Sequence, residues 1–139
     1  YSIFKKITMS NKLDKILAEI SAGELIDKIT ILEIKKIKIS DVNKLKDIEK
    51  ELLSLNETFK KFIPNSSTIH SLMSNLKSVN LKLWDIENGK RLAEKNNDFG
   101  EKFIELARNV YKGNDQRAKI KLEINNFLGS NIKEIKSHF

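Results

Sequence analysis

The sequence predicts an all-α fold: a helical bundle of about five helices, built on a long antiparallel hairpin of coiled-coil type. Apolar residues recur every three or four positions along almost the whole chain, which is the spacing of one helix face. Serine and aspartate residues suited to helix capping precede several of these runs. Polar turns separate the runs, and one turn contains the only proline, Pro64.

Length and composition are those of one domain. With 139 residues, 40% of them hydrophobic and 32% charged, the chain is long enough to bury a core of its own. We expect a single helical domain over residues 10–139 and a leader or disordered N-terminus over residues 1–9, since Met9-Ser10-Asn11 is a more natural start. The chain has no cysteine, which excludes disulfides and thiolate chemistry.

The first predicted helix covers residues 22–39. Ser21-Ala-Gly-Glu24 has the form of a capping box, in which the serine hydroxyl accepts a free backbone N–H at the helix start. The isoleucines that follow cover more than one stripe, so we expect this helix at the centre of the bundle, buried on two sides. A strand over residues 29–34 is the competing interpretation, which the capping box disfavours.

The hairpin is predicted from two consecutive runs. Apolar residues step by three and four from Leu45 to Phe62, stop before Pro64, and repeat the same steps from Ile69 to Ile86. Matching seams on consecutive helices favour antiparallel packing of one helix against the other. The same helical surfaces also offer a seam for a homodimer.

Two shorter helices are expected to close the bundle after a loop at residues 96–100. One spans residues 101–112 and the other residues 115–128, with Gly113-Asn114 as the break between them. Gly129 is well placed just after the end of the second. The inward-facing residues expected on that last helix are Ala118, Ile120, Ile124, Phe127 and Leu128.

The net charge of +7 does not by itself indicate nucleic-acid binding. The excess is +3 over residues 1–63 and +4 over residues 64–139, so no basic arm stands out. The chain has 23 lysines, 19 isoleucines and 14 asparagines, the combination that AT-rich codons produce. Nucleic acid is therefore not an expected partner. No run reaches the ~18 apolar residues of a membrane span, and we expect a cytoplasmic protein.

Arginine is the scarce basic residue: only Arg91, Arg108 and Arg117 occur among 26 lysines and arginines. A guanidinium is a flat fork that binds carboxylate or phosphate through paired hydrogen bonds. Arg108 and Arg117 lie on the two helices expected to meet at Gly113, so the sequence predicts a ligand-binding cluster between these helices. The candidate residues are Arg108, Tyr111, Asn114, Asp115, Arg117, Lys121 and Asn125.

Cations that converge against an apolar surface need a neutralising anion. The anion can be internal, which makes the cluster a structural ion-pair network, or it can belong to a ligand. Glu87 and Arg91, four residues apart, are expected to pair on an exposed face. Trp84 is interpreted either as core or as a ring-stacking residue of a site. The candidate counter-charges within the chain are Glu24, Asp27, Glu33 and Glu87.

The chain lacks the residue patterns that most enzyme chemistries require. It has no Ser-His-Asp spacing, no glycine-rich phosphate loop and no two-histidine helix motif. His70 and His138 do not make a metal site, so no metal and no cofactor are expected. A bundle that catalyses by electrostatic clamping alone, as chorismate mutases do, stays open.

Four stretches form longer motifs: GELIDKITILEIK at 23–35, LWDIE at 83–87, DFGEKFIELARNVY at 98–111 and NDQRAKIK at 114–121. They resemble a family of small bacterial and phage-borne proteins that is catalogued as a domain of unknown function. The resemblance covers roughly residues 20–137. The resemblance implies no established activity. It implies a link to surface-polysaccharide synthesis.

These observations favour a non-catalytic helical binding or adaptor module linked to surface-polysaccharide synthesis. The alternative is a small all-helical enzyme or sensor that binds an anionic metabolite, a phosphate or a carboxylate, through the cluster. The expected partner is accordingly a protein or an anionic small molecule. A roomy groove that receives Arg108 and Arg117 would favour the ligand site, whereas full engagement of both by internal carboxylates would favour the structural network.

Overall fold

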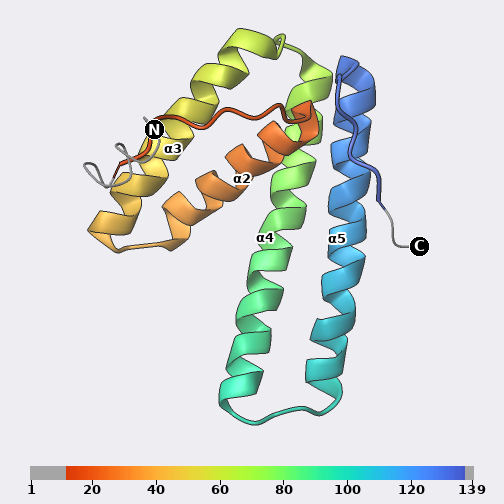
Figure 1. Ribbon diagram of the computed structural model, residues 1–139. Coiled ribbons are helices and arrows are strands. Elements are labelled where there is room, and N and C mark those ends of the chain that lie inside the picture. Colours follow the sequence, from red (N-terminus) through yellow and green to blue (C-terminus); the bar gives the residue numbers. More distant parts are fainter. Residues whose placement is uncertain (1–11, 137–139) are drawn as a thin grey trace, which may run out of the picture.

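The computed structural model describes residues 12–136, which form four helices and no strand (Figure 1). The all-α class is thus confirmed, while the predicted leader at residues 1–9 lies outside the described residues. The helices are α2 (Ala22–Lys38), α3 (Val42–Phe62), α4 (Ser67–Lys95) and α5 (Glu101–Leu128). No helix of this part of the chain is long and apolar enough to cross a membrane.

Helix α2 is the central element, because α3, α4 and α5 all pack against it. Its N-cap is Ser21, whose hydroxyl accepts the backbone N–H of Glu24 at 3.0 Å, as the capping signal predicts. Ile29 faces α3 in one core cluster with Leu32, Ile48 and Leu52. Ile26 lies in the other, with Ile69, Leu76 and Ile124. Burial on both sides explains the isoleucines around most of the α2 surface.

The predicted pairing of α3 with α4 is wrong. Helix α3 packs on α2, and α4 runs beside α5 along most of its length, whereas α3 and α4 diverge from their connecting turn (Figure 1). Apolar spacing identifies which face of a helix is buried but does not identify the helix that buries it. Phe62, placed on the predicted seam, is exposed at the end of α3.

The predicted break at Gly113 is also wrong. Because the two last helices are one, residues 12–136 contain four helices instead of the five expected. Helix α5 continues through Gly113, where an added Cβ would lie only 2.6 Å from Leu83 Cδ2 of α4. The glycine therefore lets two helices approach closely. Phe127, expected to face inward, is exposed.

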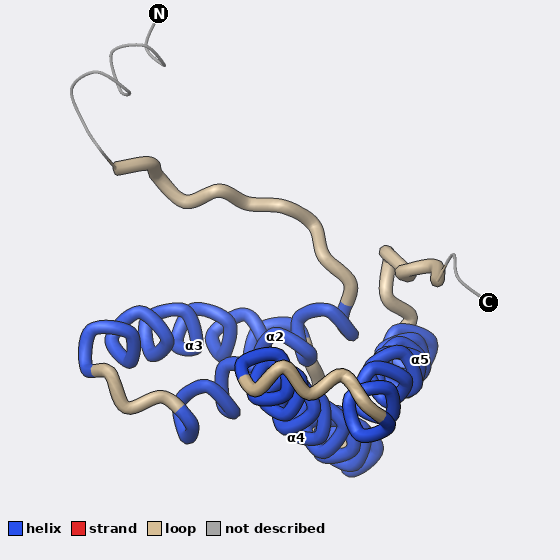
Figure 2. The backbone as a smooth tube through the Cα atoms, turned by 90° about the horizontal axis from the view of Figure 1, so that it is seen from below, coloured by secondary structure: helices blue, strands red, loops and turns tan. Residues whose placement is uncertain are grey.

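The segments that flank the four helices meet beside the start of α2. Residues 12–20 form an extended arm that stands clear of the helices in Figure 2. Gly129, with φ of 62°, ends α5 in the left-handed conformation that favours glycine. The tail that follows returns towards α2, where the Ala22 N–H donates to Ser130 Oγ at 3.1 Å and Ser21 Oγ donates to Glu134 at 2.9 Å.

Candidate functional site

A buried carboxylate lies at the centre of the contact between α2, α4 and α5. The side chain of Asp27 has 0% exposed surface. Arg117 donates to it from Nε, at 3.1 Å and 3.0 Å to the two oxygens, and from Nη2 at 2.5 Å. Asn80 Nδ2 donates to Asp27 Oδ1 and to Thr30 Oγ1, both at 2.9 Å. Asp27 therefore has the partners that a buried charge requires.

Lys121 extends this network by one turn of α5. Its Nζ lies 2.6 Å from Glu24, 3.0 Å from Glu134 and 3.8 Å from Asp27. Burial alone would lower the pKa of Lys121, but the hydrogen bonds to Glu24 and Glu134 outweigh it and the pKa is raised. The hydrogen bonds to Asp27 likewise raise the pKa of Arg117, against the effect of burial. Both cations are thus held in their charged form.

Asn125 completes the line on α5 that faces the start of α2. Its side chain is fully buried, and its Oδ1 accepts the Gly23 N–H at 2.6 Å. That bond fixes which way the amide points, because only the oxygen can accept. Gly23 is needed at this contact, since an added Cβ would lie 2.6 Å from the Lys121 carbonyl oxygen. Asn125 is therefore part of the helix contact.

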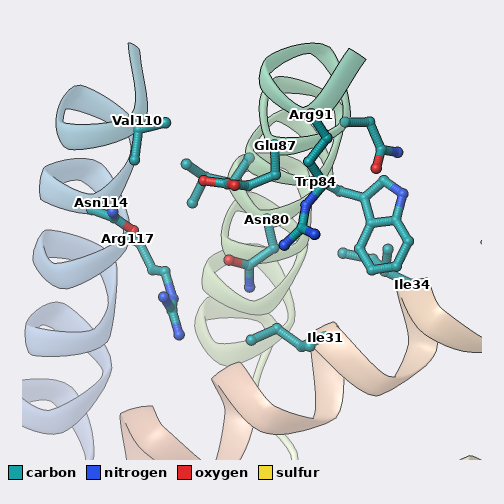
Figure 3. A pocket seen from close by; sticks show the side chains of 11 residues that line it. Ile31, Ile34, Asn80, Trp84, Glu87, Arg91, Val110, Asn114 and Arg117 are labelled. Atoms are coloured by element: carbon teal, nitrogen blue, oxygen red, sulfur yellow. The ribbon is translucent and has the colours of Figure 1, made fainter. Parts of the chain in front are cut away.

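A pocket of about 580 Å³ opens beside this network, between α2, α4 and α5 (Figure 3). Its apolar wall includes Ile31, Ile34 and Val110, and Trp84 of α4 lies against the α2 side. The volume is within the range of small-molecule sites, about 300–1,000 Å³. The polar residues that line it are Asn80, Glu87, Asn88, Arg91, Asn114 and Arg117.

The two arginines of the pocket differ in how they are neutralised. Arg117 is bound to Asp27, yet 32% of its side chain is exposed and its Nη1 takes no part in the hydrogen bonds to Asp27. Arg91 has no ion-pair partner within residues 12–136. The predicted pair of Glu87 with Arg91 is not formed; Glu87 lies 3.6 Å from Lys90 instead. Arg91, which is exposed, therefore brings to the pocket a guanidinium that no carboxylate of the described chain engages.

The predicted cluster is divided between two sides of α5. Arg117, Lys121 and Asn125 meet α2, while Arg108 and Tyr111 are exposed. The continuous helix explains the division: at about 100° per residue, the nine positions from Arg108 to Arg117 turn the side chain to the opposite face. An unbroken α5 cannot direct both arginines into one groove.

The remaining candidates have separate places. Asn114 lines the pocket beside Arg117. Asp115 pairs with Lys136 of the tail, and Glu33 lies 3.6 Å from Lys77. Of the four proposed counter-charges, Glu24 and Asp27 neutralise the α5 cations, whereas Glu33 and Glu87 pair with lysines.

Asn80 is a site residue that the sequence analysis missed. It is a buried amide on α4 that contacts Asp27 and lines the pocket. Its position in the sequence could have identified it, since Asn80 follows Val79 directly and lies four residues after Leu76, on the buried face of the helix. A polar residue on a buried face requires a polar partner.

The histidines stay apart from this region. His70 Nε2 lies 2.9 Å from Asn65 Oδ1 in the turn before α4, and His138 lies outside the described residues. Within residues 12–136, no group of three or more His, Asp or Glu side chains is arranged to hold a metal ion.

Comparison with known proteins gives one match. Among curated proteins and among solved structures, none matches the chain. A family model does match, over residues 16–138, and its description is a family of unknown function, DUF6165. The stretch includes all four helices, with Asp27, Asn80 and Arg117. The chain therefore belongs to the DUF6165 family, as its motifs indicate.

Proposed function

We propose that this domain is a non-catalytic binding module that holds a small anionic molecule in the pocket between α2, α4 and α5. The observation that carries the proposal is Arg91, a guanidinium that lines the pocket without a carboxylate partner in the described chain. A phosphate or carboxylate would supply paired hydrogen-bond acceptors and an opposite charge for this guanidinium.

The position of Arg117 supports this proposal. Its bonds to Asp27 hold the guanidinium in place, and its exposed part lines the same pocket as Arg91. A group that is already fixed loses little conformational freedom when a ligand binds. Arg117 thus serves the structural network and presents a preorganised donor to the pocket.

The rest of the lining indicates a ligand with a flat or apolar part as well as a charge. The Trp84 ring and the aliphatic wall offer a surface for such a part. Asn88, Asn114 and Glu87 add donors and acceptors at the rim, which suit hydroxyl or amino groups. Phosphorylated metabolites and nucleotide sugars have this combination, and nucleotide sugars are also what a role in surface-polysaccharide synthesis would require.

The test is a thermal-shift screen of the full chain against inorganic phosphate, phosphorylated metabolites and nucleotide sugars. A ligand that binds the native state raises the melting temperature with its concentration. We expect Arg91→Gln to abolish the shift while leaving the unliganded melting temperature unchanged, because Arg91 has no partner to lose. Arg108→Gln is the matched control, an exposed arginine outside this pocket, and should retain the shift.

Two outcomes would contradict the proposal. A shift that survives Arg91→Gln would place the ligand elsewhere. The absence of a shift with every compound class would leave the pocket without an anionic ligand and favour an adaptor that binds only proteins.

A further inference from the structure

The extended arm at residues 12–20 carries aliphatic side chains that the described part of the chain leaves exposed. Leu13 is 72% exposed, Ile16 81% and Leu17 89%. Three large aliphatic groups within so short a segment form a concentrated exposed patch.

The spacing of these residues does not match their conformation. Leu13, Ile16, Leu17 and Ile20 fall on one stripe of a helix, and the residues between them are lysine, aspartate, alanine and glutamate. The segment contains no glycine and no proline. It is nevertheless extended, as expected of a short helix without a packing surface, because helices below about 12–15 residues are marginal in water. The arm has the sequence of an amphipathic helix without a surface to fold against.

A surface that fits such a helix lies on the outer side of α5. A groove of about 370 Å³ lies between α5 and the tail, and its lining includes Ala118, Leu122 and Ile135, the last of which is 90% exposed. Along α5 its lining extends from Asp115 to Asn125, ten steps of 1.5 Å or about 15 Å. A helix over residues 12–20, eight steps of the same rise, would be about 12 Å long.

The arm does not reach this groove on its own molecule. Its base is fixed beside the tail, where Glu19 accepts a hydrogen bond from Asn131 and Ser21 donates one to Glu134. From there the arm runs away from α5, towards the side of α3, in both Figure 1 and Figure 2. The groove that lies open to an arm is therefore the groove of another copy.

We infer that two copies of this chain exchange arms, each arm folding as a short helix into the α5–tail groove of the other copy. The contact is reciprocal, so it closes as a two-fold dimer and leaves no free groove. Lys12 and Lys15 balance Asp14 and Glu19, so the arm has no net charge and lacks the basic face that draws an amphipathic helix to an anionic membrane. The groove lining also has both signs of charge, with Lys119 beside the paired Asp115 and Lys136, as the arm does.

The first test is sedimentation velocity and far-ultraviolet circular dichroism of the full chain over a concentration series. We expect a monomer–dimer equilibrium in which helical content rises together with the dimer fraction, since the arm folds only when docked. Leu17→Lys on the arm and Leu122→Lys in the groove should each give a monomer. Leu53→Lys is the matched control, an exposed leucine on α3, and should dimerise like the unaltered chain.

A second test identifies the two surfaces in contact. Because the chain has no cysteine, the Leu17→Cys and Leu122→Cys proteins each contain one thiol. Mixed under mild oxidation, they should form the mixed disulfide-linked dimer in preference to either like pair. Leu53→Cys mixed with Leu122→Cys should not. A monomer at every concentration, a dimer insensitive to Leu17→Lys, or a Leu17→Cys/Leu122→Cys double variant that closes only within one chain would overturn the inference.

Discussion

Arg117 on α5 donates hydrogen bonds to both carboxylate oxygens of Asp27 on α2, across a sequence separation of 90 residues. The pair is asymmetric, because Asp27 has 0% of its side chain exposed and Arg117 32%. The carboxylate depends on the protein for all of its partners, whereas the guanidinium keeps one edge towards the pocket. Removing the charge of Asp27 and removing the charge of Arg117 should therefore have different consequences for stability.

Replacing Asp27 by asparagine should destabilise the domain strongly. The change keeps the shape but removes the charge that neutralises Arg117, and breaking a buried pair costs about 3–5 kcal/mol. We expect a loss of about 3 kcal/mol, near the lower limit because Arg117 is partly exposed to water. Urea unfolding measures it. Glu33→Gln, which removes a looser and more exposed pair with Lys77, should change stability by less than about 1 kcal/mol.

A double variant separates the pair from its surroundings. Asp27→Asn combined with Arg117→Gln removes both charges, so no unpaired charge is left in the contact between α2 and α5. We expect the double variant to lose less stability than the sum of the single variants, by about 1–3 kcal/mol. Additive losses in the same urea experiments would show that the two side chains stabilise the fold independently.

The same substitution should have opposite effects on stability at two glycines, because Gly23 lies in the close contact between α2 and α5 and Gly89 does not. Gly23→Ala places a Cβ 2.6 Å from the Lys121 carbonyl oxygen, so the helices must separate, at a cost of about 1–3 kcal/mol. Gly89→Ala meets only the end of the Leu106 side chain, at 3.3 Å. Because alanine favours helix over glycine by about 1 kcal/mol, that variant should be unchanged or slightly more stable. Melting temperatures of the two proteins distinguish them.

The tail should detach from α2 in acid. Burial alone would raise the pKa of Glu134, but hydrogen bonds from Lys121 and Ser21 outweigh it and lower the pKa below the ordinary 4.5. A lowered pKa means that this carboxylate stabilises the fold above pH 4.5 and ceases to do so as the pH falls through its folded value. We expect Glu134→Gln to lower the melting temperature at neutral pH and to narrow the difference from the unaltered chain well below pH 4.5. An equal difference at all pH values would contradict this account.

Local signals in the sequence predicted the helices well. The structure has the cap at Ser21, the turn at Pro64 and the loop after α4 at the predicted positions, because capping and turn formation depend on neighbouring residues. The partners of the helices were not predictable in the same way. Leu52 and Leu76 lie on seams with the same spacing. Leu52 nevertheless packs in the core between α2 and α3, and Leu76 in the core between α2, α4 and α5.

The candidate site shows the same limit. Arg117, Lys121 and Asn125 were correctly placed on one line, since their spacing on a single helix fixes it. Arg108 was wrongly joined to them because Gly113 was interpreted as a helix break. A glycine that ends a helix and a glycine that lets another helix approach have the same sequence signal, and only Leu83, packed against Gly113, distinguishes them.

The central position of α2 has a consequence for synthesis. Translation proceeds at about 5–20 residues per second, so the 90 residues that separate Asp27 from Arg117 take about 5–20 s to appear. During that interval α3 and then α4 become available to cover parts of the apolar surface of α2, while α5 is still missing. The side of α2 that packs on α5 stays uncovered, and the carboxylate of Asp27 lacks its Arg117 partner, until α5 is made. Of the four described helices, the one translated first is therefore the last to be fully enclosed.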